Sequence, residues 1–511
     1  MIALSMPPLG LYPLAWVALV PLLMRWSIRK PSLDYARELY ALLLTTSCCL
    51  GFWLLFNPDP GQAAGGGASL FLTPLPLTIA FVLAGAVKER VGKPLGLVAL
   101  VLNVLTAEFM TLKLSLSVPW LVLGHTQVEA LEFIQIADLG GVLLISLWVL
   151  ALNITAFLAL PRKQLGHDAQ PTAIGQQGMY FGVFAALIAI PVVYGSVRTA
   201  QSDVPSGFAR IAIVQPGIAP REWDAQKAPE KVRYLSSLSD DLLARWNPSA
   251  LDSSAVARQR GSTGDVGLLI WPQSSIPQMP SAREESRLYQ RLSDWGERRG
   301  VSLLAGAVVG SSNGEGTAGD MDTAVLFRPG KPTVTYNPMR SVMVTDNSQA
   351  RGDERVLLDA GGTEIATTVG FESVFGDHVR QFTKSGANLI VVLSRNDLWG
   401  RTSGLYQHMM ITRLRAIESR RAVVLSTVSG VSAMITPSGN IHETAGWMDQ
   451  DVVPIEAPIF RHETLYVRHG DWLGAWALGL SLVFNIGVVL ITSLYPATMS
   501  RRKTSVRAAH T

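Results

Sequence analysis

Cysteine is almost absent from this sequence. The 511 residues include two cysteines, Cys48 and Cys49, which are adjacent and lie inside an apolar run. Neighbouring cysteines rarely form a disulfide, and their spacing suits no metal site. The polar region 198–471 has no cysteine. This absence excludes a disulfide and a thiol nucleophile from that region.

Charged residues are also scarce. Asp, Glu, Lys and Arg make up 16% of the chain, and 48% of the residues are hydrophobic. Soluble domains usually carry about 25% charged residues, so part of this chain is expected to lie in lipid. The net charge of +4 is small, and the basic residues stand in short loops. This pattern predicts a membrane partner and no nucleic acid.

Seven apolar segments approach the length of a membrane-spanning helix, which is about 20 residues. Pro7, Pro8 and Pro13 interrupt the start of the first one. We therefore expect either a bent hairpin over residues 1–24 or a helix missing before residue 1. The segments are 11–24, 40–56, 69–87, 95–112, 140–160, 179–197 and 472–494.

Basic residues occur in alternate loops between these segments. They follow the first, third, fifth and last segments, whereas loops 57–68 and 113–139 carry one lysine between them. Basic loops usually stay in the cytoplasm. The predicted organisation is therefore six or so membrane helices in 1–197, an outer-face domain in 198–471, an anchoring helix in 472–494 and a basic cytoplasmic tail in 495–511.

Short apolar runs alternate with helical patterns in region 198–471, which predicts a layered α/β domain. The expected helices are 229–245, 284–298, 378–385 and 406–419. The expected strands are 209–214, 267–271, 301–309, 323–327, 333–336, 364–369, 387–393, 422–427 and 432–435.

Ordered motifs in this domain resemble the nitrilase superfamily. They read VQPGIA (214–219), LLIWPQSSIP (268–277), TYNPMRSVMV (335–344), VGFESVFGD (369–377), LSRNDLWG (393–400) and RLRAIESRR (413–421). The flanking PLGLYPLAWVALVPLL (8–23), PWLVLGHTQ (119–127), IADLGGV (136–142) and YVRHGDW (466–472) are similar to one membrane branch, the apolipoprotein N-acyltransferases.

The resemblance implies a helical bundle in the bacterial inner membrane that carries an α-β-β-α sandwich on its periplasmic or outer face. It also implies a chemistry without metal or cofactor. In that family a Glu–Lys–Cys triad moves an acyl chain from phospholipid to cysteine, and then to the amino terminus of a lipoprotein. The glutamate acts as base and the lysine stabilises the oxyanion.

All three triad positions are substituted in this chain. Gln273 stands where the family has glutamate, Pro338 where it has lysine, and Gly370 where it has cysteine. A neutral amide cannot take a proton at pH 7, and glycine offers no nucleophile. Arg340 is the nearest cation to the lost lysine, and Glu372 is the best retained acid, either as a structural carboxylate or on the substrate side.

The resemblance also places residues on the substrate side of the site. Trp120 is either an interfacial anchor or part of a lipid entry. No serine is given a base by its spacing, although Ser274, Ser275 and Ser373 lie near the triad positions and His378 and His408 lie in the domain. The substrate-side residues are Trp120, Trp223, Asp346, Phe371, Asn396 and Asp397.

Arg413, Arg415, Glu418, Arg420 and Arg421 crowd one predicted helix end. Their spacing favours a solvated or intradomain salt-bridge face, and the alternative is a site for anionic lipid headgroups.

Three functions stay open. The first is a non-catalytic relative of the acyltransferases that binds phospholipid, lipoprotein or a partner enzyme. The second is a working acyltransferase with an unrecognised nucleophile, and the third is a structural membrane subunit.

Overall fold

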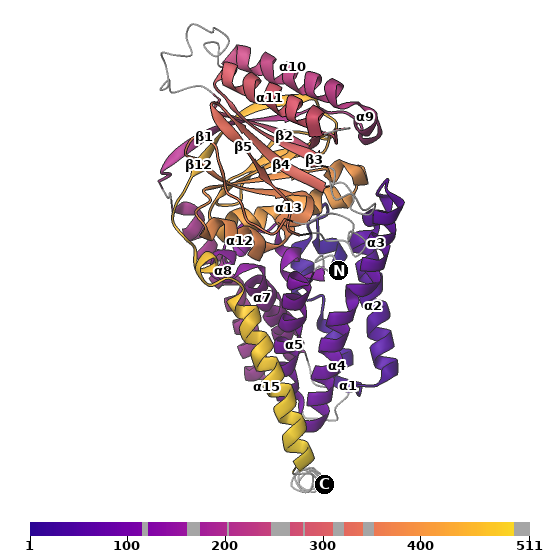
Figure 1. The fold of residues 1–511 in the computed structure, drawn as a ribbon. Coiled ribbons are helices and arrows are strands. Elements are labelled where there is room, and N and C mark those ends of the chain that lie inside the picture. The colour runs from indigo at the N-terminus through magenta and orange to yellow at the C-terminus, as the bar shows by residue number, and fades with distance from the viewer. Residues whose placement is uncertain are drawn as a thin grey trace, which may run out of the picture.

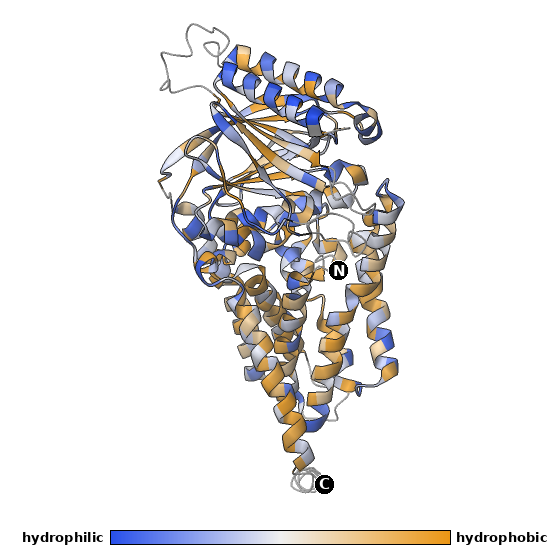
Figure 2. Ribbon diagram, in the orientation of Figure 1, coloured by the Kyte–Doolittle hydropathy of each residue, from blue (hydrophilic) through white to orange (hydrophobic). Residues whose placement is uncertain are grey.

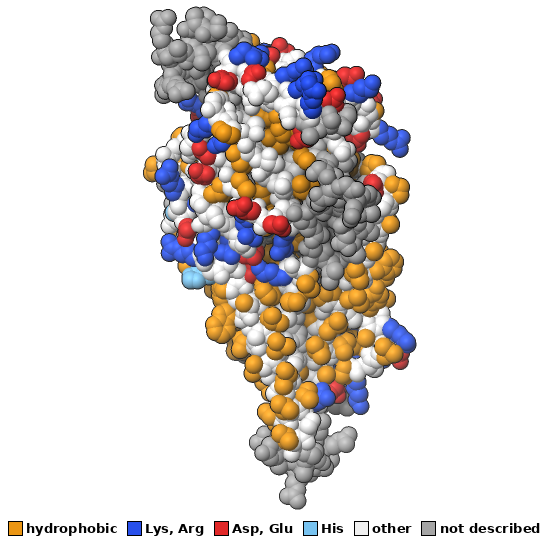
Figure 3. All heavy atoms as spheres, viewed as in Figure 1, with side chains coloured by type: hydrophobic (Ala, Val, Ile, Leu, Met, Phe, Trp, Pro, Cys, Tyr) orange, Lys and Arg blue, Asp and Glu red, His pale blue; other side chains and the backbone are white. Residues whose placement is uncertain are grey.

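The computed structural model describes residues 1–114, 121–160, 174–201, 204–246, 266–279, 282–309, 321–340 and 352–494. A bundle of helices forms one half of the molecule, and a layered α/β domain stands on one end of it (Figure 1). Apolar residues dominate the helices, whereas the domain mixes both kinds (Figure 2). Charged side chains gather on the domain surface and at its junction with the helices (Figure 3).

Six helical segments within the described residues are long and apolar enough to cross a membrane: Leu33–Phe56, Pro60–Val91, Lys93–Lys113, Ala137–Ala159, Gly175–Ala200 and Trp472–Leu494. They coincide with six of the seven predicted segments. Side chains such as Ile190 and Val483 are 66% and 72% exposed, as expected for helix faces that meet lipid. The helices are α1 (Val20–Ile28), α2 (Leu33–Gly51), α3 (Pro60–Leu72), α4 (Pro74–Val91), α5 (Lys93–Lys113), α6 (Leu131–Ile134), α7 (Ala137–Ala159), α8 (Ile174–Ala200) and α15 (Trp472–Leu494).

The first predicted segment, 11–24, is not one continuous helix. A 3-10 turn, η2 (Tyr12–Trp16), precedes α1, and a proline lies in the first turn of each. A shorter 3-10 turn, η1 (Ala3–Ser5), precedes both. Proline lacks the N–H that a helix interior needs, so it is tolerated where a helix begins.

The prediction that 57–68 is a loop is wrong, because most of it belongs to α3. Asp59 accepts a hydrogen bond from the Gln62 backbone N–H at 2.8 Å, and Pro60 occupies the first turn. Gly66 lets α3 approach the preceding 3-10 turn η3 (Phe52–Phe56), since a Cβ there would lie 3.0 Å from the Leu54 carbonyl oxygen. The glycines thus serve close packing.

The α/β domain contains two six-stranded sheets among the described residues, in the orders β12-β1-β2-β3-β4-β5 and β11-β10-β9-β8-β7-β6. Strands β1, β2 and β3 are parallel, as are β7, β8 and β9. The strands are β1 (Gly207–Gln215), β2 (Leu268–Ile276), β3 (Ser302–Val309), β4 (Met321–Arg328), β5 (Lys331–Tyr336), β6 (Leu358–Asp359), β7 (Glu364–Val369), β8 (Leu389–Ser394), β9 (Ala422–Thr427), β10 (Ser432–Ile435), β11 (Ile441–Ala445) and β12 (Asp451–Ile459).

Helices cover the outer face of each sheet, which gives the expected α-β-β-α order (Figure 1). Trp223, Leu235, Trp271 and Trp295 belong to the apolar layer under α10 and α11. The two sheets contact each other through β2, β8 and β9. On the far side α12 and α13 lie against the membrane helices. The domain helices are α9 (Pro220–Ala225), α10 (Ala228–Trp246), α11 (Ala282–Arg299), α12 (Gly376–Lys384), α13 (Ser403–Ser419) and α14 (Leu465–His469).

Every predicted strand and helix of this domain is present, but three strands were missed. β12 pairs antiparallel with β1 from Asp451 to Ile459. Its Pro454 and Pro458 argue against a strand in sequence, yet proline is tolerated on an edge strand such as this. β6 is a two-residue strand and β11 a five-residue strand, too short to give a clear alternation.

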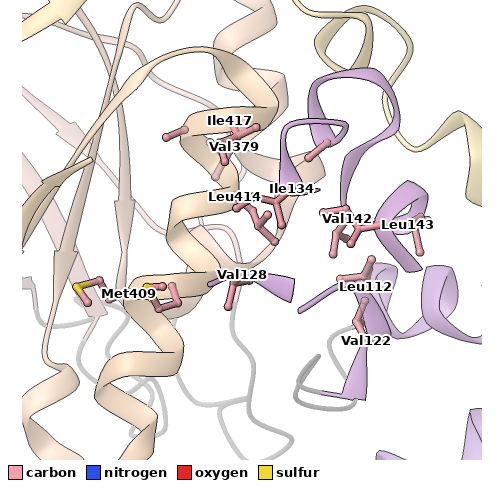
Figure 4. Close-up of a cluster of buried hydrophobic side chains, with 14 of the residues drawn as sticks. Leu112, Val122, Val128, Ile134, Val142, Leu143, Val379, Met409, Leu414 and Ile417 are labelled. Carbon is pink, nitrogen blue, oxygen red and sulfur yellow. The ribbon is translucent and has the colours of Figure 1, made fainter. Parts of the chain in front are cut away.

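Buried charges fix the domain on the bundle. Arg420, after α13, pairs with Asp138 in the first turn of α7 at 2.8 Å, and Asp138 also binds Arg198 of α8 at 3.0 Å. Lys113, at the end of α5, pairs with Asp377 and Asp471 at 2.6 and 3.0 Å. Figure 4 shows the apolar part of the same junction, where Leu414 lies beside Ile134.

Replacing Asp138 with asparagine is expected to lower the free energy of unfolding by about 3–5 kcal/mol, because two guanidinium groups lose their counter-charge in a buried site. Unfolding of the full-length protein in detergent measures the change. Glu456→Gln is the control, since its pair with Arg210 is 59% exposed on the glutamate side and is worth about 0–1 kcal/mol. Equal effects of the two variants would contradict the structural role of Asp138.

Candidate functional site

The site lies where β7 ends. The strand leads into Gly370, whose φ of +61° is left-handed, and then into a 3-10 turn, η8 (Gly370–Val374). We call this turn, Gly370–Val374, the elbow. Glycine adopts this conformation without the strain that other residues bear. A Cβ built on Gly370 would have one described atom within 4 Å, Gln273 Oε1 at 3.8 Å. The fold therefore places Gln273 and Gly370 face to face.

Asp322 fixes the orientation of the Gln273 amide. Gln273 Nε2 donates to Asp322 Oδ2 at 2.9 Å, and the Ser274 hydroxyl donates to Asp322 Oδ1 at 2.9 Å. This leaves Gln273 Oε1 buried, aimed at Gly370 and without a hydrogen bond to the described residues. The group opposite the elbow is thus a neutral acceptor, which can orient a donor on a ligand but cannot remove a proton at neutral pH.

Arg340 does not approach Gly370 in this structure. Its guanidinium lies 4.9 Å from the centre of the Phe375 ring, and Nη1 is 3.4 Å from the Leu112 carbonyl oxygen. No described atom of Arg340 lies within 4 Å of a Cβ on Gly370. Pro338 contributes its carbonyl oxygen, which accepts a hydrogen bond from the Gly352 N–H at 2.9 Å. Among the described residues, the segment after β5 is therefore held in place without a cation within 4 Å of a Cβ on Gly370.

Glu372 is fully buried, and its carboxylate ties the elbow to the segment after β5. It accepts hydrogen bonds from the backbone N–H groups of Val369, Met339 and Arg340 at 3.0, 2.7 and 3.1 Å. The Tyr336 hydroxyl donates to it at 3.0 Å, and burial together with this carboxylate raises the pKa of Tyr336. With its oxygens so engaged, the structural interpretation of Glu372 is favoured over the substrate-side one.

Buried polar atoms without partners among the described residues gather at the carboxyl ends of the parallel strands. They are Trp223 Nε1, after β1, and Asn396 Oδ1, Asn396 Nδ2 and Asp397 Oδ1, after β8. Asn396 and Asp397 belong to the 3-10 turn η9 (Asn396–Trp399). A buried polar group that makes no hydrogen bond costs about 1–3 kcal/mol, so a water or ligand group that reached these atoms would lower that cost.

Charged groups surround this polar region. Arg395 forms ion pairs with two carboxylates, that of Asp224 at 2.8 Å and that of Asp397 at 3.3 Å. Lys231 of α10 is 2% exposed, and its Nζ lies 4.7 Å from the centre of the Trp223 ring. Burial lowers the pKa of Lys231 to about 8. The sequence did not single out Lys231, because a lone lysine in a helix carries no signal of burial.

Phe371 connects the elbow with the membrane helices. Its ring stacks on Trp399 at 4.9 Å between centres and lies 6.3 Å from Trp53 of η3. The surrounding apolar cluster includes Leu121, Ile2 and Leu77. The same three residues line a mainly apolar cavity of about 410 Å³ among α1, α2, α4 and α5. Apolar side chains therefore run without interruption from the elbow to a cavity between the helices.

Spacing gave no serine a base, but the fold brings a histidine to Ser373. Its hydroxyl lies 3.0 Å from His408 Nε2 and 3.2 Å from Thr412 Oγ1. Ser373 and His408 are 35 positions apart on different elements, so spacing could not reveal the pair. Both residues are 0% exposed, and the aromatic ring of Phe371 covers His408 at 5.4 Å. The pair is sealed from substrate in this conformation.

The predicted arginine face is not solvated. Arg415 pairs with Glu418 at 3.1 Å inside the domain, whereas Arg420 reaches across to Asp138 of α7. Arg421 donates to the carbonyl oxygens of Ala387 and His462 at 2.9 and 2.8 Å. The cluster is buried because this end of α13 lies between the sheet and the bundle. Two further predicted site residues, Trp120 and Asp346, lie outside the described residues.

Burial lowers the pKa of His408 from 6.5 to about 4, against a smaller opposing effect of the Gly370 backbone. The unfolded chain therefore binds a proton first as the pH falls. We expect full stability above about pH 6.5 and a loss of about 3 kcal/mol between pH 6.5 and 4. Denaturant unfolding in detergent at several pH values measures this loss.

His408→Gln is expected to flatten this part of the pH dependence, and His442→Gln, which changes an exposed histidine, is expected to leave it as in the wild type. If His408→Gln does not alter the slope of the unfolding free energy against pH, the imidazole of His408 is not buried in its neutral form.

Comparison with known proteins matches both halves of the chain. Residues 1–155 match the family model described as the apolipoprotein N-acyltransferase N-terminal domain, and residues 210–457 match the carbon-nitrogen hydrolase model. An apolipoprotein N-acyltransferase of Chlorobaculum tepidum is 26% identical, over 94% of this chain and 92% of that protein. One from Geobacter metallireducens is 26% identical, over 93% and 91%.

Among solved structures, Nit3 of Saccharomyces cerevisiae, a member of branch 10 of the nitrilase superfamily, is 14% identical with a TM-score of 0.39, over 51% of this chain and 93% of that one. The two family models follow one another in the same order as the helical bundle and the α/β domain. The chain belongs to the apolipoprotein N-acyltransferase family, the membrane branch of the nitrilase superfamily.

Proposed function

We propose that this protein is a catalytically degenerate relative of the N-acyltransferases that binds phospholipid or lipoprotein without forming an acyl-enzyme. One observation carries this proposal. Gly370 occupies the elbow with no side chain, and the group that faces it is the neutral amide of Gln273. Covalent acyl transfer needs a nucleophile activated by a base, and neither stands at these positions.

The binding half of the proposal has separate support. Buried atoms of Trp223, Asn396 and Asp397 that have no hydrogen-bond partner among the described residues offer polar contacts at the strand ends. Phe371 leads from there to the apolar cavity of about 410 Å³ among the helices. A lipid has the matching chemistry, with a polar head and an apolar chain. A partner enzyme that presents a lipidated substrate would use the same surface.

The family and the alternation of basic loops support a place in the inner membrane of a bacterium, with the α/β domain on the periplasmic or outer face. Lipoproteins and the outer leaflet of that membrane are accessible there. The apolar helices and the relatives from bacteria agree with this location.

A second candidate function rests on the contact between Ser373 and His408. A histidine that is neutral at pH 7 can accept the proton of a serine hydroxyl, so an acyl-serine enzyme is the form in which an unrecognised nucleophile would act. Acylation of Ser373 would require Phe371 and the η8 turn to move, because Ser373 and His408 are both buried.

Incubation of the purified protein with phospholipid labelled in its acyl chains is expected to give retained lipid and no covalent acyl adduct. Mass spectrometry after denaturation detects an adduct, and Ser373→Ala controls for the second candidate. An adduct that hydroxylamine removes, or complementation of a strain that lacks its own N-acyltransferase, would overturn the non-catalytic proposal. Failure to retain any lipid would favour a structural subunit.

Restoring the triad is expected to restore an acyl adduct. The variant combines Gly370→Cys, Gln273→Glu and Pro338→Lys with Asp322→Asn, because Asp322 would otherwise repel the new glutamate from 2.9 Å. A Cβ at Gly370 meets no clash, although its φ of +61° carries some strain. The control variant carries Gly370→Ala instead of Gly370→Cys, together with the same three other substitutions. If neither variant forms an acyl adduct, the acyl-binding cavity has also changed.

A further inference from the structure

A second pocket lies on the opposite side of α13 from the sealed Ser373–His408 pair, and no residue of the elbow lines it. Its volume is about 880 Å³, within the range of small-molecule sites. Its walls come from the amino-terminal segment, the loop before α6, α13 and the β10–β11 turn, and include Glu129, Tyr406, Met409, Arg413 and Ile441.

Arg413 supplies a positive charge to this pocket. Unlike Arg415 and Arg420 in the same cluster, it forms no ion pair with the described residues. Its Nε donates to the carbonyl oxygen of Gly439, and its Nη1 donates to that of Val128 at 2.9 Å. These two contacts fix the guanidinium through Nε and Nη1. Its charge is therefore held at the pocket with no carboxylate of the described residues in contact with it.

Glu129 supplies the matching negative charge. It is half-buried and lines the same pocket, yet it makes no hydrogen bond or ion pair with the part of the chain that the structure describes. Burial raises the pKa of its carboxyl group, and Arg413 opposes the effect from beyond contact distance. Two opposite charges thus face one cavity on separate elements and do not neutralise each other directly.

The pocket lies where the helical bundle meets the α/β domain. Val128 and Glu129 belong to the outer connection between α5 and α7, and Figure 4 shows Val128 beside α13, where Met409 is also labelled. Met409, Met410, Ile441 and Pro8 add apolar lining next to the charges. The complementary ligand carries an anionic group and a protonated amine close together on an apolar body.

We propose that this pocket binds a zwitterionic phospholipid whose phosphate contacts Arg413 and whose primary ammonium contacts Glu129. Guanidinium–phosphate and ammonium–carboxylate contacts are charge-assisted hydrogen bonds, which are stronger than neutral ones. The lipid is held there and not consumed, because Gly370 and Gln273 do not line the pocket. The inference is independent of whether the elbow retains any chemistry.

Titration of the full-length protein in detergent with three dioleoyl lipids tests this site, with binding followed by native mass spectrometry. Phosphatidylethanolamine is expected to bind about tenfold more tightly than either of the other two lipids. Phosphatidylcholine has a cation without N–H donors, and phosphatidylglycerol has no cation. Glu129→Gln is expected to remove this preference, lowering the affinity for phosphatidylethanolamine about tenfold while leaving that for phosphatidylglycerol unchanged.

Glu132→Gln is the matched control, because Glu132 lies three residues further on, also acts on Arg413 over distance, and does not line the pocket. It is expected to keep the preference. Glu129 is the residue to vary because Arg413 also holds two loops and its loss could unfold the protein. Equal binding of the three lipids by the wild type, or equal losses in both variants, would overturn the proposal. Binding of glycerophosphoethanolamine as tightly as the intact lipid would overturn the choice of a membrane lipid.

Discussion

The charge pairs buried under α13 govern the arrangement of the whole molecule. Arg420 and Asp138 are 4% and 3% exposed and pair at 2.8 Å between the domain and the bundle. Two buried charges in contact are strongly favoured over either one alone, since an unpaired charge in such a place is costly. Lys113 adds a second connection at the end of α5. Together with the apolar contacts of the junction, these pairs hold the α/β domain on the helical bundle.

The frame of the site and its chemistry depend on different residues. Glu372 anchors the segment after β5 through three backbone N–H groups and the Tyr336 hydroxyl. These contacts need a buried carboxylate and do not involve a nucleophile. Substitution at Gln273, Pro338 and Gly370 therefore leaves the local fold intact. The local shape of the site therefore does not depend on which residues stand at positions 273, 338 and 370.

Much of this fold could be predicted because its signals are local. The apolar runs of the spanning helices and the buried strands β7, β8 and β9 are continuous in sequence. β12 was missed because its prolines argue against a strand unless its edge position is known. The facing of Gln273 and Gly370 could be expected from the ordered motifs. The contacts of Ser373 with His408, and the burial of Lys231, could not, since they join elements far apart in the chain.

The sequence by itself determined that the chain has membrane helices and an α/β domain, and that residue 370, at the end of a buried strand, is glycine. Composition, hydrophobic period and residue identity are sufficient for these conclusions. Only the tertiary structure decided which charges are paired. Arg413 and Arg420 stand seven positions apart in one crowded stretch, yet Arg420 meets Asp138 and Arg413 faces a pocket opposite Glu129. Pairing depends on distances of a few ångströms between separate elements, which the order of residues along the chain does not specify.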